Sequence, residues 1–542
     1  MEAIERESDP KNLRLHLSRV LGILETYHEQ HDRDKEENQA LRNELNRLKG
    51  EQGKPEIRPN KDNSRDISSE KERQTNPPKE RKGRRARNHK VPITRPQQKC
   101  YFPSEDLPPD AVFKGFRRVI IQDIKIVLDN VELLLEVFHS PSTKKTYLAA
   151  RPPGCEGEYG PGVRTFILTT KHMGNMSESC IHDMLTSYGI LISKSSISRI
   201  SRRDAALFHS DAEDILKVGV LAGKYIHIDD TGARVDGRQH FTQILCNPFF
   251  TAYATLPHKD RLSILRKLLM GMELKFQFND ATFDLLKIFK VPEKVRKYLK
   301  KNCDGRTLTE QELVILLKKI PSDNRNPDQL YRRIMEAAGI TMYHEQKEVP
   351  VIQTLVSDDA SQFRHIVDFH SLCWIHAGRF IKKLNPLTPL FQDEVSRVRK
   401  EFWSYYKTLL AFQKEPEQAD IEDLRVQFNK IFSQKTDFPA LDQILRTIFD
   451  NKEKLLLVLK FPHVPLHNNP AELGARVAVR KRDVSLHTMT PEGTKAVDTS
   501  MTIIQTAKKL EVNPITYILD RLTHNELERL PVTLLKKAGF PT

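Results

Sequence analysis

The chain has 542 residues, of which 38% are hydrophobic, and its 87 Lys and Arg against 72 Asp and Glu give a formal net charge of +15. This length exceeds what one hydrophobic core holds, so we expect several domains, and the low hydrophobic fraction indicates that part of the chain is extended or solvated. The basic excess favours a polyanionic partner such as nucleic acid. The sequence has no run of about 18 apolar residues, which excludes a membrane-spanning helix.

Six scattered cysteines form no Cys-x-x-Cys pair, which argues for a reducing compartment and against a disulfide framework. Residues 1–10 are acidic and polar, without the apolar stretch of a secretion signal. We therefore expect a cytoplasmic protein.

Residues 1–50 are expected to form one amphipathic helix. From Leu13 to Leu48 its apolar residues alternate in steps of four and three, which is the heptad seam of a coiled coil. Asp34 interrupts the seam, and Asn38 falls at a position where a polar side chain sets register. The pattern favours a coiled coil that joins copies of the chain; a single amphipathic helix packed on its own domain is the alternative.

Residues 51–98 lose this periodicity and contain several prolines and almost no large apolar residues, so they are predicted to be a disordered linker. The linker ends in a basic cluster that includes Arg84, Arg85 and Arg87. Cations on a flexible chain bind DNA phosphates without reading sequence. A solvated charge run is an equally good interpretation of such a cluster taken alone.

Short β-like stretches at residues 117–121, 132–138 and 146–150 predict a small β domain over residues 99–152. The pattern then changes to that of helices.

Residues 153–220 are predicted to be helical and to bind DNA. One helix fits residues 176–187, and after a Gly-containing turn a second begins at Ser193, a good N-cap residue. Helix, turn and helix resemble a helix-turn-helix motif whose second helix presents Arg199 and Arg202. An ordinary helical hairpin within a core is the alternative.

A mixed α/β core is predicted over residues 221–520. The apolar stretches that we expect to be its strands lie at residues 224–228, 239–246, 250–256, 350–356 and 370–374. The first three stretches suggest an antiparallel meander, and the later ones alternate with helices. One of these helices is expected to follow the strand at 350–356 and to run to about Val367. Two polar, mostly helical stretches, 272–345 and 383–457, are interpreted as insertions, and 521–542 as a helical tail.

Carboxylates follow two of these strands and open a later helix. Asp229 and Asp358 end apolar strands, and Glu472 lies near the start of a helix. Hard divalent cations choose oxygen ligands, and in two-metal sites one ion activates the attacking oxygen while the other stabilises the leaving oxygen. Residue type alone leaves Asp230 and Asp359 open as alternatives.

Each surrounding residue also has a structural interpretation. Glu472 follows Asn469 at capping-box spacing, which favours a helix-capping role. Cys373 and His376 are half of a zinc site at most, so we expect a buried cysteine beside a hydrogen-bonded histidine. Arg476 stands four residues after Glu472 and is expected to pair with it. The cations expected to hold DNA phosphates, or to form a solvated helix end, are Arg476, Arg480, Lys481 and Arg482.

These motifs resemble the insertion sequence 66 family of bacterial transposases, which has an N-terminal leucine-rich helix, a basic linker, a small zinc-binding domain, a helical segment and a DDE core. The segments that carry the resemblance are Asp229-Asp230-Thr231, Leu355-Val-Ser-Asp358, Cys373-Trp-Ile-His-Ala-Gly-Arg379 and Asn468-Asn-Pro-Ala-Glu472. The first of them stands where the family has Asp-Glu-Thr, which selects Asp229 over Asp230.

The resemblance implies an RNase H-like core in which Asp229, Asp358 and Glu472 hold Mg²⁺ or Mn²⁺, expected as two ions. The residues that it implies as supports of this site are Cys373, Trp374, His376, Asn468 and Asn469. The family's zinc module carries Cys-x-x-Cys pairs, whereas this chain keeps only Cys100 and Cys155 nearby, so we do not expect zinc.

The same resemblance implies a transposase that excises and transfers strands at terminal inverted repeats. The partners expected are double-stranded DNA, further copies of the chain and helper proteins of the same element, near the bacterial nucleoid and away from membranes. A non-catalytic DNA-binding regulator that kept the fold and a hydrolytic nuclease that cuts without rejoining are the alternative functions.

Overall fold

The computed structural model describes residues 91–94, 96–320, 327–416 and 420–540, together with helical residues at 20–24, 27–28, 30–31, 33–35, 37–38 and 41. The linker arginines Arg84, Arg85 and Arg87 and much of the predicted coiled coil lie outside the described residues. Within the described residues, no helix has the length and apolar composition needed to cross a membrane.

A five-stranded mixed sheet forms the centre of the fold, in the strand order β5-β4-β3-β8-β9. Its strands are β3 (Ile226–Val235), β4 (Arg238–Cys246), β5 (Thr251–Leu256), β8 (Thr354–Ser357) and β9 (Phe369–Leu372). β3, β4 and β5 are antiparallel neighbours, whereas β8 pairs in parallel with both β3 and β9. This meander followed by parallel strands confirms the mixed α/β sheet predicted from the sequence.

β3 is longer than its apolar stretch predicts. It continues because its residues pair with β4 in unbroken register, from Asp229 opposite Ile244 to Val235 opposite Arg238. The intervening Asp236-Gly237 turn has φ angles of 50° and 71°, as a tight two-residue hairpin requires. Asp229 therefore lies inside a strand, and the prediction that it ends one was wrong.

The chain turns sharply after β8, where a helix to about Val367 was expected. Only a 3-10 turn, η2 (Ser361–Phe363), forms there. The Ala360 amide donates a hydrogen bond to the Asp358 carboxylate at 3.1 Å, and such local bonds from Asp favour a turn over a helix. Beyond β9, Trp374 begins a helix instead of ending the strand.

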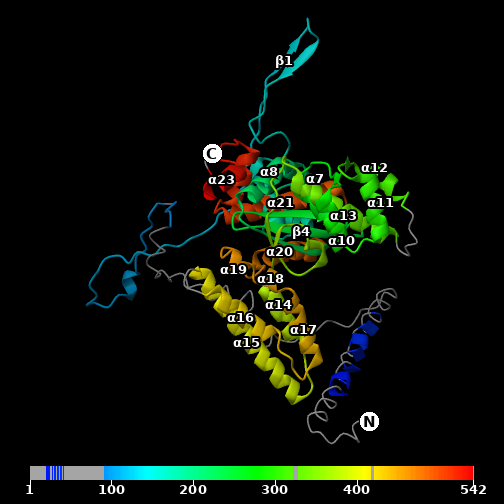
Figure 1. The fold of residues 1–542 in the computed structure, drawn as a ribbon. Helices are drawn as coiled ribbons and strands as arrows, with labels where there is room; N and C mark the ends of the chain where they lie inside the picture. The colour runs from blue at the N-terminus through cyan, green and yellow to red at the C-terminus, as the bar shows by residue number, and fades with distance from the viewer. Residues whose placement is uncertain are drawn as a thin grey trace, which may run out of the picture.

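Helices from both ends of the chain pack around this sheet (Figure 1). They are α5 (Pro161–His172), α6 (Glu178–Ser187), α7 (Lys194–Ala206), α8 (His209–Ala222), α9 (Arg261–Leu268), α20 (Asn469–Ser485), α21 (Pro491–Lys509), α22 (Pro514–Leu522) and α23 (Leu530–Lys537). α21 covers β5 and contacts α7 and α8, while α22 and α23 pack on α5 and α8. The predicted DNA-binding helices and C-terminal tail thus pack against the core.

The first predicted insertion shares the main hydrophobic core. Its elements are β6 (Phe276–Gln277), α10 (Asp280–Ile288), α11 (Glu293–Cys303), β7 (Thr307–Leu308), α12 (Glu310–Leu317) and α13 (Pro327–Glu345). Phe276, Leu286 and Ile334 are fully buried in the same cluster as Ile226 and Leu355 of the sheet. This stretch is therefore part of the core, although its sequence is polar overall.

The second insertion forms a lobe with a core of its own, seen below the sheet in Figure 1. Its helices are α14 (Trp374–Lys383), α15 (Pro389–Lys414), α16 (Ile421–Phe432), α17 (Pro439–Asp450), α18 (Lys452–Leu455) and α19 (Leu457–Lys460). Trp374 is fully buried among aromatic rings that include Phe402, Tyr405 and Phe428. α18 and α19 join the lobe to the sheet at β9.

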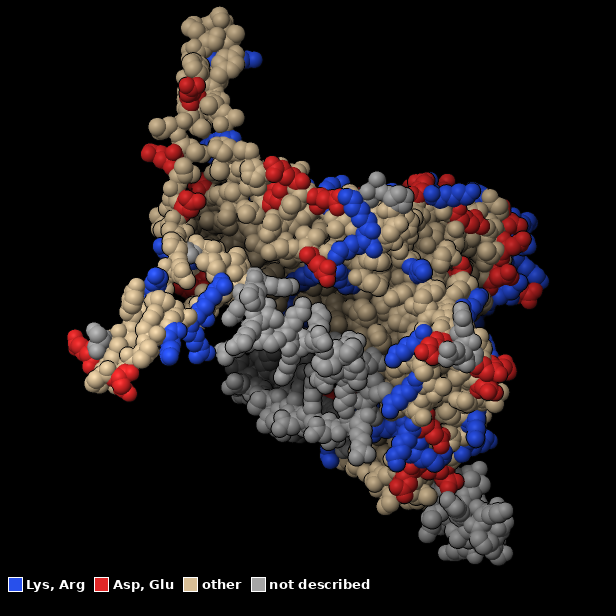
Figure 2. All heavy atoms as spheres, turned by 90° about the vertical axis from the view of Figure 1, so that its left-hand side faces the viewer, with Lys and Arg blue, Asp and Glu red and all other residues tan. Residues whose placement is uncertain are grey.

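Two extended segments project from the body in place of the small β domain expected over residues 99–152 (Figures 1 and 2). The first contains a 3-10 turn, η1 (Ser104–Asp106), and the second ends in a two-stranded hairpin, β1 (Val137–Ser140) with β2 (Lys145–Leu148). The stretch at 117–121 forms no strand. An alternating sequence specifies a sheet only when a buried face rewards the pairing, and both hairpin strands here are almost wholly exposed.

Candidate active site

Strand register brings Asp229 and Asp358 to the same level of the sheet. β3 and β8 run in parallel, with His227 opposite Val356. Asp229 and Asp358 each follow that pair by two residues along neighbouring parallel strands. The two carboxylates therefore come from adjacent strands at one position along the sheet.

Asn468 fixes the start of α20, which carries Glu472. Its side-chain amide donates to the carbonyl of Ile228 at 2.8 Å, and its oxygen lies 3.0 Å from Nδ1 of His227. Its backbone amide donates to Sγ of Cys373 at 3.3 Å. Asn468 is buried and joins β3, α14 and α20, so it positions Glu472 one turn further along the helix.

The alternative capping-box role of Glu472 is wrong. Asn468 is the N-cap residue of α20, and its side chain makes no capping hydrogen bond because it is turned toward β3. The Glu472 carboxylate pairs with Arg379 of α14 instead, at 2.9 Å. This long-range pair takes the place of the Arg476 pair expected from helix spacing.

The three carboxylates are close enough to affect one another electrostatically. Burial raises the pKa of Asp229 to about 7, opposed by the Asp230 amide and reinforced by the charges of Asp358, Asp230 and Glu472. Within the described residues, however, no three His, Cys, Asp or Glu side chains stand close enough together to hold a metal ion as they are placed.

Two residues of α14 border this carboxylate cluster. The charges of Asp358 and Glu472 both act on His376, although burial dominates and lowers its pKa. Burial lowers the pKa of Arg379, but its hydrogen bond to Glu472 and the negative charges of Glu472 and Asp229 raise it by more. The pKa of Arg379 therefore lies above its usual value. His376 was predicted as a support of the site, but Arg379 was not. Arg379 lies three residues after His376, which places both side chains on the same face of α14.

The neighbouring aspartates have other partners. Asp230 forms an ion pair with Lys259 at 2.6 Å and accepts a hydrogen bond from Gln362 at 2.8 Å. Asp359 pairs with Arg364 at 2.6 Å. Asp230 and Asp359 therefore each have a cationic partner of their own.

Comparison with known proteins places this chain in a family. The model of the Transposase IS66 family matches residues 346–496, the segment that holds Asp358, Arg379 and Glu472. The chain is also 34% identical over 310 residues to an uncharacterized protein, y4jO, of Sinorhizobium fredii, across 57% of this chain and 94% of that protein. The chain belongs to the transposase IS66 family. No solved structure matches it.

Cys373 and Trp374 are structural supports in this transposase. The Cys373 amide donates to Ser357 at the end of β8, and burial raises the pKa of its thiol to about 11. The Trp374 indole donates to the carbonyl of Leu455 at 2.9 Å, which anchors α14 in the lobe. The interpretation of Cys373 as a buried residue is thus confirmed.

The basic residues predicted to contact DNA separate into two groups. Arg199, Arg476 and Arg480 are exposed. Lys481 is buried and donates to the carbonyl of Lys171 at 2.7 Å, and Arg482 donates to the carbonyl of Gly232. A helical basic run therefore does not present all its charges to solvent, because α20 packs on the sheet.

Proposed function

We propose that this transposase cleaves DNA at the terminal inverted repeats of an insertion sequence and joins the ends to target DNA. In this proposal Asp229, Asp358 and Glu472 hold divalent ions, Mg²⁺ or Mn²⁺, in an RNase H-like core. Two observations support it: Asp229 and Asp358 take matched positions along adjacent parallel strands, and the charges of Asp358 and Glu472 both act on Asp229.

The donor set suits a hard cation, because all three side chains offer oxygen atoms. When bound, such ions activate an attacking oxygen and stabilise a leaving one. Arg379 supplies positive charge beside the cluster through its bond to Glu472. Asn468 keeps the helix that bears Glu472 against β3.

Double-stranded DNA is the proposed substrate. The net charge of +15 attracts a polyanion, and Arg476 and Arg480 are exposed on the same helix as Glu472. Arg199 on α7 and the linker arginines are further candidates for phosphate contacts.

The test is Mg²⁺-dependent cleavage of a duplex that carries the end sequence of the element. We expect Asp358→Asn to lower the cleavage rate at least about a hundredfold, since a metal ligand supports several kcal/mol of transition-state stabilisation. Asp359→Asn is the matched control and should cleave within a few-fold of the unaltered protein. Binding of the same duplex, measured without metal, should be similar for all three proteins.

Cleavage that survives Asp358→Asn would overturn the assigned site. DNA binding by the unaltered protein without cleavage would favour the regulator instead. Cleavage without strand-transfer products from pre-cut 3′ ends would favour the hydrolytic nuclease.

A further inference from the structure

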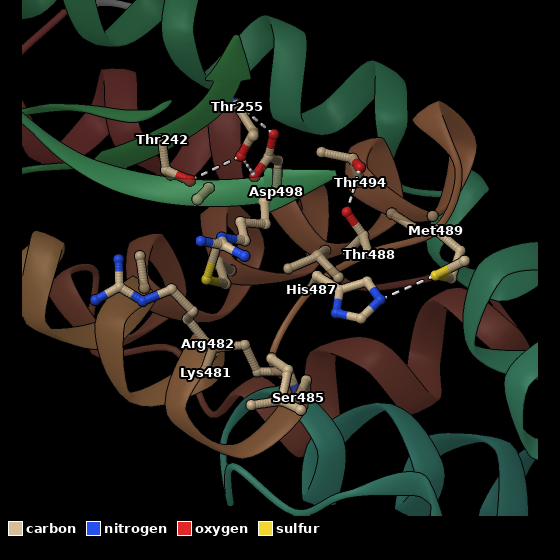
Figure 3. Close-up of a pocket in the computed structure, with 18 of the residues that line it drawn as sticks. Thr242, Thr255, Lys481, Arg482, Ser485, His487, Thr488, Met489, Thr494 and Asp498 are labelled. Atoms are coloured by element: carbon tan, nitrogen blue, oxygen red, sulfur yellow. Dashed lines mark hydrogen bonds between the residues drawn. The ribbon is translucent and has the colours of Figure 1, made fainter. Parts of the chain in front are cut away.

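A cavity of about 610 Å³ lies where the C-terminal end of α20 meets α7, α21 and the end of the β3–β4 hairpin (Figure 3). The volume falls within the roughly 300–1,000 Å³ of pockets that bind small organic ligands. It is too small for duplex DNA.

Cations dominate the charged residues of its lining. They are Lys171, Arg202, Arg234, Lys481 and Arg482, against Glu178 and Asp498. Lys171 is neutralised by Glu178 at 2.7 Å. Arg202 and Arg234 are exposed, and no acceptor among the residues that the structure describes binds either guanidinium. Two guanidinium groups without an internal partner favour an anionic ligand, and their fork of donors matches phosphate.

One wall of the cavity is polar and internally bonded. Thr255 donates from its amide and its hydroxyl to Asp498, at 2.7 and 2.9 Å, and Thr242 lies 2.8 Å from the Thr255 hydroxyl (Figure 3). Because these groups bond to one another, they hold this wall of the cavity in place.

The loop after α20 brings apolar side chains to the cavity. Leu486 and Met489 are 69% and 62% exposed. Leu486 has a φ of 59°, which is strained for a residue other than glycine, and strained residues cluster at ligand sites. The loop is nevertheless held in place, because the Asp236 amide donates to Thr488 and the Thr488 amide to Arg234.

We propose that this cavity binds one nucleotide, with its phosphate on Arg202 and Arg234 and its base against Leu486 and Met489. The nucleotide comes either from an unpaired position in a DNA strand or from free solution. The first source rests on the proposed function, since it needs DNA at the carboxylate cluster.

Two elements connect the cavity with the carboxylate cluster and give the same spacing. Lys481 follows Glu472 by nine residues on α20, which is about 14 Å along a helix. Ala233 follows Asp229 by four residues on β3, which is about 13 Å along a strand. A DNA strand advances about 3.4 Å per nucleotide. The nucleotide in the cavity would therefore lie roughly four positions along the strand from the nucleotide at the carboxylates. Extruding one nucleotide is least costly where it is already unpaired.

The experiment compares two duplexes that differ by one bulged, unpaired nucleotide, with binding to the full chain measured by fluorescence anisotropy without divalent metal. We expect the bulged duplex to bind at least about tenfold more tightly, through charge-assisted phosphate contacts and base stacking. R202A and R234A should each remove most of this preference. R238A, which removes the same charge from the same hairpin outside the cavity, should keep it.

A second arm uses AMP, with binding measured by calorimetry. AMP binding that R234A abolishes, without a preference for the bulged duplex, would identify free nucleotide as the source. The proposal would be overturned if the unaltered protein neither prefers the bulged duplex nor binds AMP. It would also be overturned if the preference or the AMP binding is unchanged in both R202A and R234A.

Both arms omit metal and cleavage, so they are independent of the catalytic test. If the unaltered protein prefers the bulged duplex but does not cleave DNA, only the proposed function is refuted. Thermal melting of each variant confirms that it is folded.

Discussion

Asp229 shows what the carboxylate cluster costs the folded protein. Its pKa of about 7 arises mainly from burial, against a value of 3.8 for an exposed aspartate, and the neighbouring carboxylates add to the shift. The folded state therefore retains this proton more strongly than the unfolded chain does. Between these two values stability falls as pH rises, and above about 7 the full penalty of a buried charge remains.

We therefore expect Asp229→Asn to increase the free energy of unfolding at pH 8, by about 2–4 kcal/mol given roughly 1.4 kcal/mol for each pKa unit. The gain should shrink toward pH 5, where the native carboxyl is already protonated. Urea unfolding at both pH values with a chelator present provides the measurement. Asp359→Asn, whose native carboxylate is paired with Arg364, should show no such gain. Equal effects at both pH values would contradict the buried-charge explanation.

Asp229→Asn also tests whether a divalent ion binds at this carboxylate. An ion that binds only the folded state raises stability, so Mg²⁺ should stabilise the unaltered protein and fail to stabilise Asp229→Asn.

At the scale of elements, α20 is positioned by its close approach to the sheet. A Cβ on Gly474 would lie 2.7 Å from Cγ2 of Ile244, a side chain of β4. The hydroxyl of Tyr253 also donates to the Gly474 carbonyl at 3.2 Å. A glycine at this point lets the helix lie low enough for Asn468 and Glu472 to reach the strands.

Gly474→Ala is therefore expected to destabilise the fold by about 1–3 kcal/mol, because overpacking outweighs the gain of about 1 kcal/mol in helix propensity. DNA cleavage should fall with it, since Glu472 moves with the helix. Gly162→Ala in α5 meets open space and should be neutral or stabilising by up to about 1 kcal/mol. Denaturant unfolding measures the free energy of unfolding of both variants. If Gly474→Ala is more stable than the unaltered protein, the helix has room to shift.

At the scale of the whole molecule, the N-terminal helix exposes the apolar seam residues that the structure describes. Leu24 and Tyr27 on the seam are 58% and 71% exposed, whereas Leu21 on another face packs against the core of the lobe. Exposed apolar residues on this seam favour pairing with a second copy through the predicted coiled coil.

Leu24→Asp should shift the protein from dimer toward monomer, because an unpaired charge is costly inside a coiled-coil seam. Size-exclusion chromatography with light scattering gives the mass. Lys35→Glu, an exposed change off the seam, should leave the mass unaltered. If the unaltered protein is already monomeric at micromolar concentration, the coiled-coil prediction is wrong.

Local patterns in the sequence predicted both strands and the helix that carry Asp229, Asp358 and Glu472, in their order along the chain. Ser193 was expected to cap a helix, and its side chain accepts a hydrogen bond from the Ser196 amide. Such features depend on residues within a few positions of one another. Chain order and strand patterning also sufficed for the mixed sheet, because a meander followed by crossovers has few ways to pair.

Contacts across long stretches of chain decided the rest. Arg379 pairs with Glu472 across 93 positions, and Asn468 bonds Ile228 across 240. The buried direction of Lys481 depends on α5, which lies more than 300 positions away. By itself the sequence determined which segments form strands and helices and which carboxylates follow them, since those are local preferences. Only the tertiary structure decided which charges face each other, because that free energy exists only once distant segments have packed together.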